Sequence, residues 1–385
     1  MKSKLKLLFA FLFFIFLITA GSLVQASEYS PVNYERLPAG VYTQITPEVE
    51  LLAGVLSQTT WIDRKGIGPE GDGNYYFQEL QAFFEDYKDH EAIKIAQDLT
   101  DRGFTFDAPL GFIVTLGSLP ELEPKAEYSE YLVGRAEPNN LLDRIFGPDG
   151  QRKLEDFRLA LIDLAEKSEF MSFFNLYRDD FKGYLEKTME GFDAGRKINW
   201  LSDFTGLDTE NEYYTILTPA MFPGGGYGPS VELPDGSYQF YQIVRERGFS
   251  QAEPEFPTGI GFNRLTLHEW GHSFIDPGVE AHSEYILENL KDHFHKVEDS
   301  MRSQAYDSPM IFFREQILRA VTTVASGELY GEKYYYEELE HHIERDFHLT
   351  EVTVKLIEKY IDNRDNYNAF EEFVPEILEE YKRLI

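Results

Sequence analysis

Between residues 268 and 272 the chain reads His-Glu-Trp-Gly-His. The residues from Asn263 to Ile275 have a helical pattern, and Asp276-Pro277-Gly278 is expected to end that helix. Because His268 and His272 are four residues apart, their imidazoles project from one face of the helix. Two nitrogens at this spacing can reach one Zn²⁺ at roughly 2.0–2.1 Å. The segment therefore predicts a metal site, with Zn²⁺ as the cofactor.

Glu269 follows directly and lies about 100° around the helix from His268. A glutamate in that place can take the proton of a water that attacks a carbonyl and pass it to the leaving nitrogen. We therefore expect Glu269 to be the catalytic base of a zinc-dependent hydrolase. The alternative is that the two histidines simply lie on a polar helix face. The chain has only nine histidines, so the expectation of this pattern by chance is about a few in a hundred.

A catalytic zinc needs a third protein ligand and an open position. The metzincin continuation is absent, since Ile275 and Gly278 stand where its glycine and third histidine would be. The candidates are Glu280, His282, Glu284 and Glu315. Glu315 lies on an otherwise apolar helix, where a buried carboxylate needs a partner. Arg319, one turn on, is either that partner alone or a group that orients a ligating carboxylate.

The first 26 residues have the pattern of a signal peptide. Lys2, Lys4 and Lys6 precede an apolar run from Leu7 to Ile18, and small residues at Val24-Gln25-Ala26 offer a cleavage site. The run is short for a spanning helix, which makes an uncleaved anchor the weaker alternative. We therefore expect export to the extracellular or periplasmic space, without stable membrane insertion after cleavage.

Composition narrows the chemistry further. The chain has no cysteine, so thiolate ligands, a cysteine nucleophile and disulfides are excluded, and a metal site must use histidines and carboxylates. It carries 36 Lys+Arg against 67 Asp+Glu, a net charge of −31. Such a surface repels phosphate backbones and anionic membranes, so nucleic acid is not expected as a partner. Acidity does not name a substrate; a peptide or protein substrate is expected from the predicted zinc-hydrolase site instead. The oligomeric state is not indicated.

The pattern along the chain predicts a helix-rich α+β fold. Residues 27–46 form an extended lead-in and 47–200 a helical N-terminal region, in which 123–150 is the best linker candidate. Residues 201–340 form the expected catalytic core, and 341–385 add C-terminal helices.

Within that core, a small antiparallel or mixed sheet is expected ahead of the histidine helix. Strands are predicted at 213–218 and 238–244, joined by a glycine-rich loop from Pro223 to Pro229. Residues 224–228 either shape the rim of a cleft or form a surface turn. A later helix is expected to start at Ser308-Pro309 and to stop at Gly327.

Three segments resemble a family of secreted bacterial proteins that is catalogued as a domain of unknown function and taken to be zincin-like peptidases. They are residues 48–52 (EVELL), 265–277 (LTLHEWGHSFIDP) and 315–320 (EQILRA). The resemblance spans roughly Pro47 to the late 330s, and its last two elements are fairly specific. It implies a gluzincin-type metallopeptidase fold with Glu315 as the third ligand. Members commonly have Asn where this chain has Asp276, which leaves the metal-facing side unchanged.

Other groups are candidates for supporting roles. Asp276 and Arg319 can orient metal ligands from outside, and Tyr330, His341 or His342 can polarise an oxyanion. The Tyr334-Tyr335-Tyr336 cluster is more typical of packing. In zincin-like folds an edge strand above the metal pairs with an extended substrate. The alternatives to a peptidase are an exported binding or scaffold protein with structural zinc or none, and a zinc amidase that acts on cell-wall material.

Overall fold

In the computed structural model, the structure describes residues 29–63, 73–105, 108–125, 150–207, 211–220, 225–246, 253–304 and 306–385. The expected signal peptide (1–26) and nearly all of the expected linker (126–149 of 123–150) lie outside these residues. No helix in the described ranges has both the length and the apolar character that a membrane span requires.

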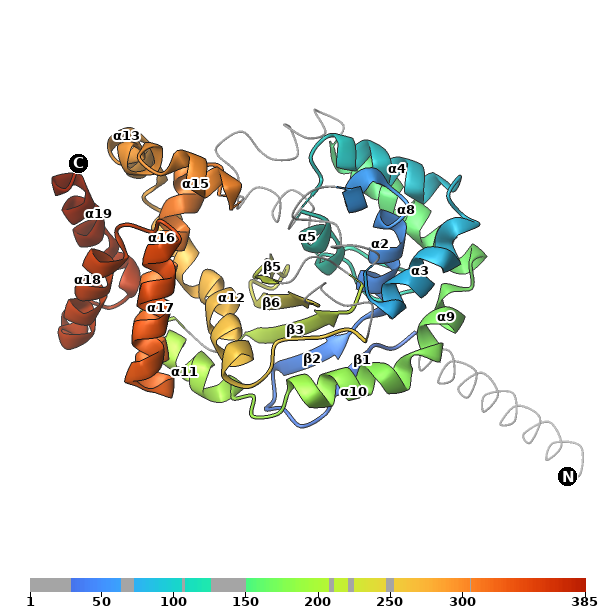
Figure 1. Cartoon of the computed structure of the whole chain (residues 1–385), viewed down its shortest axis with the longest axis horizontal. Helices are drawn as coiled ribbons and strands as arrows, with labels where there is room; N and C mark the ends of the chain where they lie inside the picture. Colours follow the sequence, from blue (N-terminus) through green and yellow to red (C-terminus); the bar gives the residue numbers. More distant parts are fainter. Residues whose placement is uncertain are drawn as a thin grey trace, which may run out of the picture.

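A mixed sheet lies at the centre of the molecule (Figure 1). Its strands are β1 (Val32–Tyr34), β2 (Val41–Ile45), β3 (Glu212–Thr218), β4 (Gly225–Tyr227), β5 (Ser230–Glu232) and β6 (Tyr238–Arg245). β2, β3 and β6 run parallel, β1 pairs antiparallel with β2, and β4 and β5 both pair antiparallel with β6. The expected α+β class with a small mixed sheet is confirmed. The lead-in supplies β1 and β2, so the N-terminal segment is part of the same sheet.

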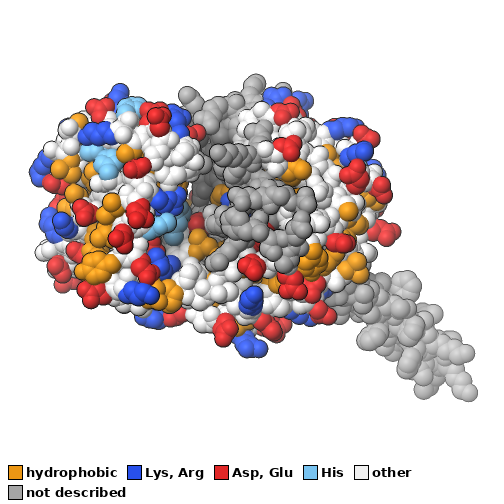
Figure 2. Space-filling model, viewed as in Figure 1, with side chains coloured by type: hydrophobic (Ala, Val, Ile, Leu, Met, Phe, Trp, Pro, Cys, Tyr) orange, Lys and Arg blue, Asp and Glu red, His pale blue; other side chains and the backbone are white. Residues whose placement is uncertain are grey.

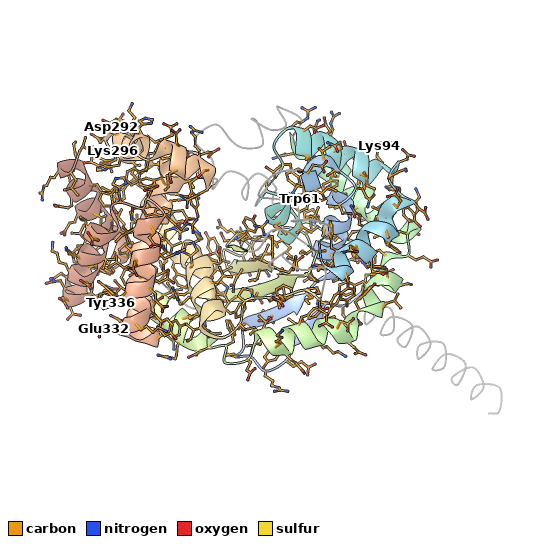
Figure 3. All side chains as sticks on the ribbon, viewed as in Figure 1. Trp61, Lys94, Asp292, Lys296, Glu332 and Tyr336 are labelled. Carbon is orange, nitrogen blue, oxygen red and sulfur yellow. The ribbon has the colours of Figure 1, made fainter. Side chains whose placement is uncertain are left out.

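The helices from α2 to α10 form one lobe, on the right in Figure 1. They are α2 (Pro47–Leu56), α3 (Tyr75–Glu85), α4 (Glu91–Asp101), α5 (Ala108–Val114), α8 (Gly150–Lys167), α9 (Phe170–Leu176) and α10 (Arg178–Thr188), with the short helix η1 (Thr60–Asp63). The next helix, α11 (Ala194–Thr205), belongs to the hydrophobic core of the other lobe. Trp61 of η1 is 1% exposed and belongs to the lobe's hydrophobic core (Figure 3). The Thr46 side chain accepts a hydrogen bond from Val49 N and thereby caps α2, which directly follows β2.

The helices after β6 form a second lobe, on the left in Figure 1. They are α12 (Gly259–Glu280), α13 (Ser283–Asn289), α14 (Lys291–His295), α15 (Glu298–Ser303), α16 (Pro309–Tyr330), α17 (Glu332–Glu344), α18 (Thr350–Asp362), η3 (Arg364–Asn366), η4 (Phe370–Glu372) and α19 (Val374–Arg383). α12 packs against both α16 and the β4–β6 side of the sheet. The divisions expected after residues 200 and 340 fall inside α11 and α17, and α12, α16, α18 and α19 share one hydrophobic core.

The predicted start of α16 is confirmed, whereas its predicted stop is wrong. Ser308 accepts a hydrogen bond from Ile311 N, and Pro309 takes the first helical position. The helix then passes Gly327 and ends at Tyr330, before Gly331 with φ 107°. Gly327 serves packing instead, since a Cβ there would lie 3.0 Å from the Cβ of Tyr335 on α17.

The predicted end of α12 is also wrong. The helix continues through Asp276-Pro277-Gly278 to Glu280. Pro277 removes a backbone donor and crowds the carbonyl four residues before it, but it stands in the last turn, where few further helical bonds depend on it. Val279 is fully buried, and Asp276 and Glu280 both contact Arg314 of α16. These tertiary contacts hold the last turn in helical form.

The expected loop from Pro223 to Pro229 contains a strand. Gly225–Tyr227 forms β4, with Gly226 opposite Val244 and Tyr227 opposite Ile243 of β6. Glycine has little preference for strands, but the edge of β6 supplies hydrogen-bond partners for the segment. The expected rim region thus lies on the sheet itself.

Candidate metal centre

His268, His272 and Glu315 converge between α12 and α16. Glu315 Oε2 lies 3.6 Å from His268 Nε2, and Glu315 Oε1 lies 3.4 Å from His272 Nε2. The three ligand atoms are all within 4.8 Å of one another. Ligands at about 2.1 Å from a tetrahedral ion are about 3.4 Å apart, so the spacing fits a single metal ion. Two imidazoles and a carboxylate are also a donor set that holds transition metals. This group can hold a metal ion.

The electrostatics of the site give each of the three side chains a different charge state. Burial and neighbouring cations hold the pKa of His268 at about 3, although the Glu315 charge opposes them, so this imidazole is neutral with a lone pair to offer. Burial also acts to lower the pKa of His272, but Asp276 and Glu315 outweigh it and raise that pKa to about 10. Burial raises the pKa of Glu315, yet Arg319 and the two histidines bring it well below its usual value. The carboxylate is therefore ionised in its buried position.

Asp276 lies behind His272. Its Oδ2 is 3.0 Å from His272 Nδ1, the ring nitrogen that does not face Glu315. A carboxylate in this position fixes the tautomer and orientation of a ligating imidazole. Arg314 Nε lies 3.5 Å from the same Asp276 oxygen. The continuation of α12 past the expected stop is what brings Asp276 one turn beyond His272.

Arg319 lies behind Glu315. Its Nη2 is 2.7 Å from Glu315 Oε2 and donates to the Tyr306 hydroxyl at 2.8 Å. Its Nη1 is 3.4 Å from His342 Nδ1, and the guanidinium lies 4.5 Å from the ring centre of Phe347. The arginine is 7% exposed, so its charge is compensated by these contacts rather than by water.

Glu269 points toward the glycine-rich strand. It is 5% exposed, and a Cβ added to Gly226 of β4 would lie 2.6 Å from its Oε1. A Cβ on Gly228 would lie 2.3 Å from the Glu269 carbonyl oxygen. The strand backbone therefore contacts Glu269 directly, and only glycine at these two positions permits that approach.

The remaining candidates lie elsewhere. Glu280 pairs with Arg314, and neither it nor His282 or Glu284 belongs to the convergent group found in the described residues. His342 is buried and reaches Arg319, whereas His341 is exposed. Tyr330 is 15 residues beyond Glu315 on the straight run of α16, a separation of about 22 Å at ~1.5 Å per residue. Tyr334 and Tyr336 are not part of the group formed by the two histidines and Glu315 in the described residues. The Tyr335 hydroxyl donates a hydrogen bond to Glu358.

Sequence reasoning missed Tyr306 and Glu338. Tyr306 precedes α16 and reaches the centre through Arg319, while Glu338 lies 3.2 Å from His342 and also pairs with Arg264 of α12. The only sequence signal for Glu338 is its i, i+4 spacing from His342. Tyr306 has no signal in the sequence, because its contact depends on how the segment before α16 folds back.

Residues 44–380 match a family described as a domain of unknown function, DUF4932. The chain belongs to the DUF4932 family. The DUF4932 match extends beyond the late 330s, where the resemblance seen in the sequence ends, and includes α18 and most of α19. No curated protein and no solved structure matches the chain.

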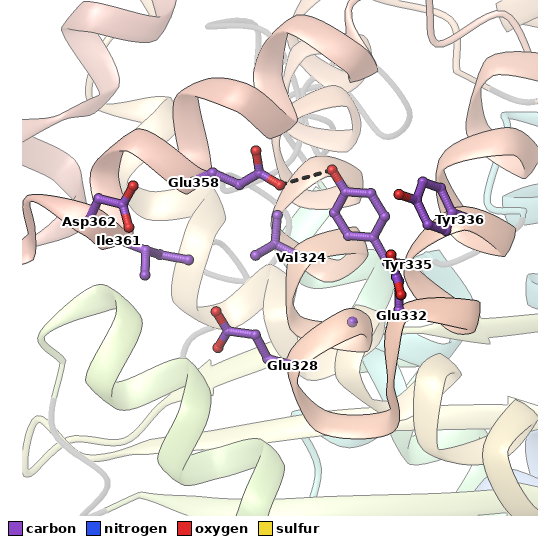
Figure 4. Close-up of a pocket in the computed structure, with 9 residues that line it drawn as sticks. Val324, Glu328, Glu332, Tyr335, Tyr336, Glu358, Ile361 and Asp362 are labelled. Atoms are coloured by element: carbon purple, nitrogen blue, oxygen red, sulfur yellow. Dashed lines mark hydrogen bonds between the residues drawn. The ribbon is translucent and has the colours of Figure 1, made fainter.

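The surface of this DUF4932 protein has a hollow whose lining residues do not include the candidate metal ligands. It has a volume of about 420 Å³ and lies between α16, α17 and α18, with Tyr335, Glu358 and Asp362 among its lining residues (Figure 4). It contains none of the predicted site residues, but it is lined by Tyr335 and Tyr336, which were expected to serve packing. Figure 2 shows carboxylates spread over the visible face of both lobes, so acidic side chains are not confined to this hollow.

Proposed function

We propose that this protein is an exported zinc-dependent metallopeptidase. The observation that carries the proposal is the convergence of His268, His272 and Glu315 at 3.4 and 3.6 Å, with Glu269 on the same helix. Two imidazole nitrogens and one carboxylate are a ligand set of catalytic zinc sites that keep one position open. The N-terminal sequence pattern supports export.

The number of ligands and the position of Glu269 both favour a catalytic metal over a structural one. A structural zinc is enclosed by four protein ligands, whereas the described residues bring only three together here. When bound, zinc supplies a Lewis acid that polarises the substrate carbonyl and acidifies a water molecule. As the water oxygen attacks the amide carbon, the Glu269 carboxylate takes a water proton. It then gives a proton to the leaving nitrogen when the C–N bond breaks.

The sheet edge beside Glu269 supports a peptide as substrate. Tyr241 N donates to Pro229 O, and the register places Tyr227 opposite Ile243. The backbone N–H and C=O groups of the odd-numbered residues in β4 and β5 therefore point toward β6. The backbone groups of Gly226 therefore point away from β6, and no further strand pairs with β4 in the described ranges. An extended peptide can align along such an edge by main-chain hydrogen bonding.

Metal analysis and cleavage assays test this proposal. The purified chain is expected to contain one zinc and to cleave a reduced, unstructured protein, and a chelator should abolish that cleavage until zinc is restored. Glu269→Gln should retain zinc while its turnover falls by roughly 10²–10⁴. Glu284→Gln, a carboxylate outside the convergent group, is the matched control and should behave like wild type. A well-folded, metal-free chain, or full activity in Glu269→Gln, would overturn the proposal.

A further inference from the structure

Tyr306 is held rigidly beside the metal centre. Its backbone N donates to Met301 O at 2.9 Å, and its ring packs edge-on against Phe347 at 5.7 Å between ring centres. These contacts fix the direction of the phenol, since both the main chain and the ring are held.

The Tyr306 hydroxyl is joined to the metal ligand Glu315 by one nitrogen of Arg319. Nη2 of Arg319 donates to the hydroxyl at 2.8 Å and lies 2.7 Å from Glu315 Oε2. The Tyr306 hydroxyl oxygen and Glu315 Oε2 are therefore no farther apart than the sum of these two distances. Among the described residues, no acceptor takes the hydroxyl hydrogen of Tyr306, which leaves that hydrogen available to a ligand.

One feature polarises this hydroxyl, and a second keeps it protonated. A hydrogen bond accepted from a guanidinium polarises the O–H group more than a neutral donor would. Burial, followed by the charge of Glu315, raises the pKa of Tyr306, and Glu269 adds to that effect. The phenol therefore keeps its proton at neutral pH, and it lies within electrostatic reach of both the ligand and the proposed base.

We propose that Tyr306 is a further catalytic residue, which donates its hydroxyl hydrogen to the substrate carbonyl oxygen as that oxygen becomes an oxyanion. The proposal rests on the proposed function. When the water oxygen bonds to the amide carbon, the carbonyl π pair moves to the oxygen, and the Tyr306 hydrogen bond stabilises the new charge. No proton is transferred to the oxyanion. The C=O bond re-forms as the C–N bond breaks, with the nitrogen protonated by Glu269.

The other groups considered for this role are less suitable. Tyr330 is too far along α16, and His342 is on the opposite side of Arg319, where its Nδ1 faces Nη1 rather than Nη2. Tyr306 combines fixed geometry, an available hydrogen and closeness to Glu315.

Tyr306→Phe tests the proposal, with Tyr330→Phe as the matched control. Zinc affinity, measured by chelator competition, should stay within about threefold of wild type, while kcat falls roughly 10²–10³-fold and KM changes little. A phosphinic analogue of a peptide that the wild type cleaves, whose tetrahedral oxygens mimic the oxyanion, should bind Tyr306→Phe about 100-fold more weakly. Tyr330→Phe should match wild type in all three measurements.

The outcomes separate the two proposals. A zinc-loaded Tyr306→Phe protein with kcat and analogue affinity within about threefold of wild type overturns the role of Tyr306 and leaves the metallopeptidase proposal standing. Loss of zinc together with activity also overturns it, because Tyr306 would then act only by holding Arg319. A wild-type chain without zinc-dependent cleavage overturns both.

Discussion

Arg319 and Glu315 face each other one turn apart on α16, with Nη2 2.7 Å from Oε2 and both side chains about nine-tenths buried. The arginine continues to His342, whose Nε2 lies 3.2 Å from Glu338, so charged groups extend from the metal centre into α17. A buried carboxylate that has such a partner is held in a fixed orientation before any ion binds. The third ligand of the proposed zinc site is therefore preorganised by the protein itself.

Substitution of Arg319 should weaken metal binding. In Arg319→Gln the Glu315 carboxylate loses its buried counter-charge and its fixed orientation, so zinc affinity should fall by roughly 10–100-fold. Chelator competition with the purified proteins measures this. Arg302→Gln, which removes a half-exposed arginine paired with Glu298, is the control and should bind zinc like wild type. Equal affinity in Arg319→Gln would show that Glu315 is held by other contacts.

Asp276 should matter for its acceptor oxygen rather than for its charge. Asp276→Ala removes the partner of His272 Nδ1, and zinc affinity should drop by about 10–100-fold. Asp276→Asn keeps an oxygen that can accept from Nδ1–H and should restore most of that affinity. Isothermal titration of the apo proteins with zinc distinguishes them. If Asp276→Asn and Asp276→Ala bind zinc equally weakly, the negative charge of Asp276 rather than its acceptor oxygen supports zinc binding.

Gly226 should be needed for the position of Glu269. Gly226→Ala places a methyl group where the Glu269 carboxylate lies, since the added Cβ would be 2.6 Å from Oε1. Displacement of the base should lower kcat by about 10²-fold while zinc remains bound, as measured by steady-state kinetics and metal content. Gly261→Ala, on α12 with open space around its Cβ, should leave kcat unchanged and slightly stabilise the helix. A fully active Gly226→Ala enzyme would mean that β4 moves away from Glu269 during turnover.

Glu50 should make the N-terminal lobe less stable as pH rises. Its side chain is fully buried on α2 and accepts a hydrogen bond from Thr218, and burial raises its pKa to about 8 from 4.5. Between these two pH values the folded state holds a proton that the unfolded state has released. The free energy of unfolding therefore falls with rising pH, by up to about 1.4 kcal/mol per pH unit.

Urea denaturation from pH 5 to pH 8 tests this for wild type and Glu50→Gln. The variant should lose the contribution of Glu50 to the slope and become the more stable protein, relative to wild type, toward pH 8. Parallel pH profiles for the two proteins would contradict the raised pKa of Glu50.

Local patterns predicted those elements whose formation depends on neighbouring residues. The Ser308-Pro309 start of α16 is confirmed because an N-cap acts within one turn, and β3 and β6 match their β-branched and aromatic runs. Patterns misplaced the ends of α12 and α16 and missed β4. In each case a contact with another helix or strand, through Arg314, Tyr335 or β6, takes part in the local structure.

The sequence by itself determined that His268, Glu269 and His272 share one helix and that two imidazoles occupy one face of it, because the period of the α-helix sets that geometry. It left Glu315 as one of four candidate ligands. Only the tertiary structure brought Glu315 to the histidines, turned Asp276 toward His272, and placed Tyr306 and Gly226 around the centre. The physical reason is that the packing of α12, α16 and β4 in the core sets these distances, and packing joins residues that no local period relates.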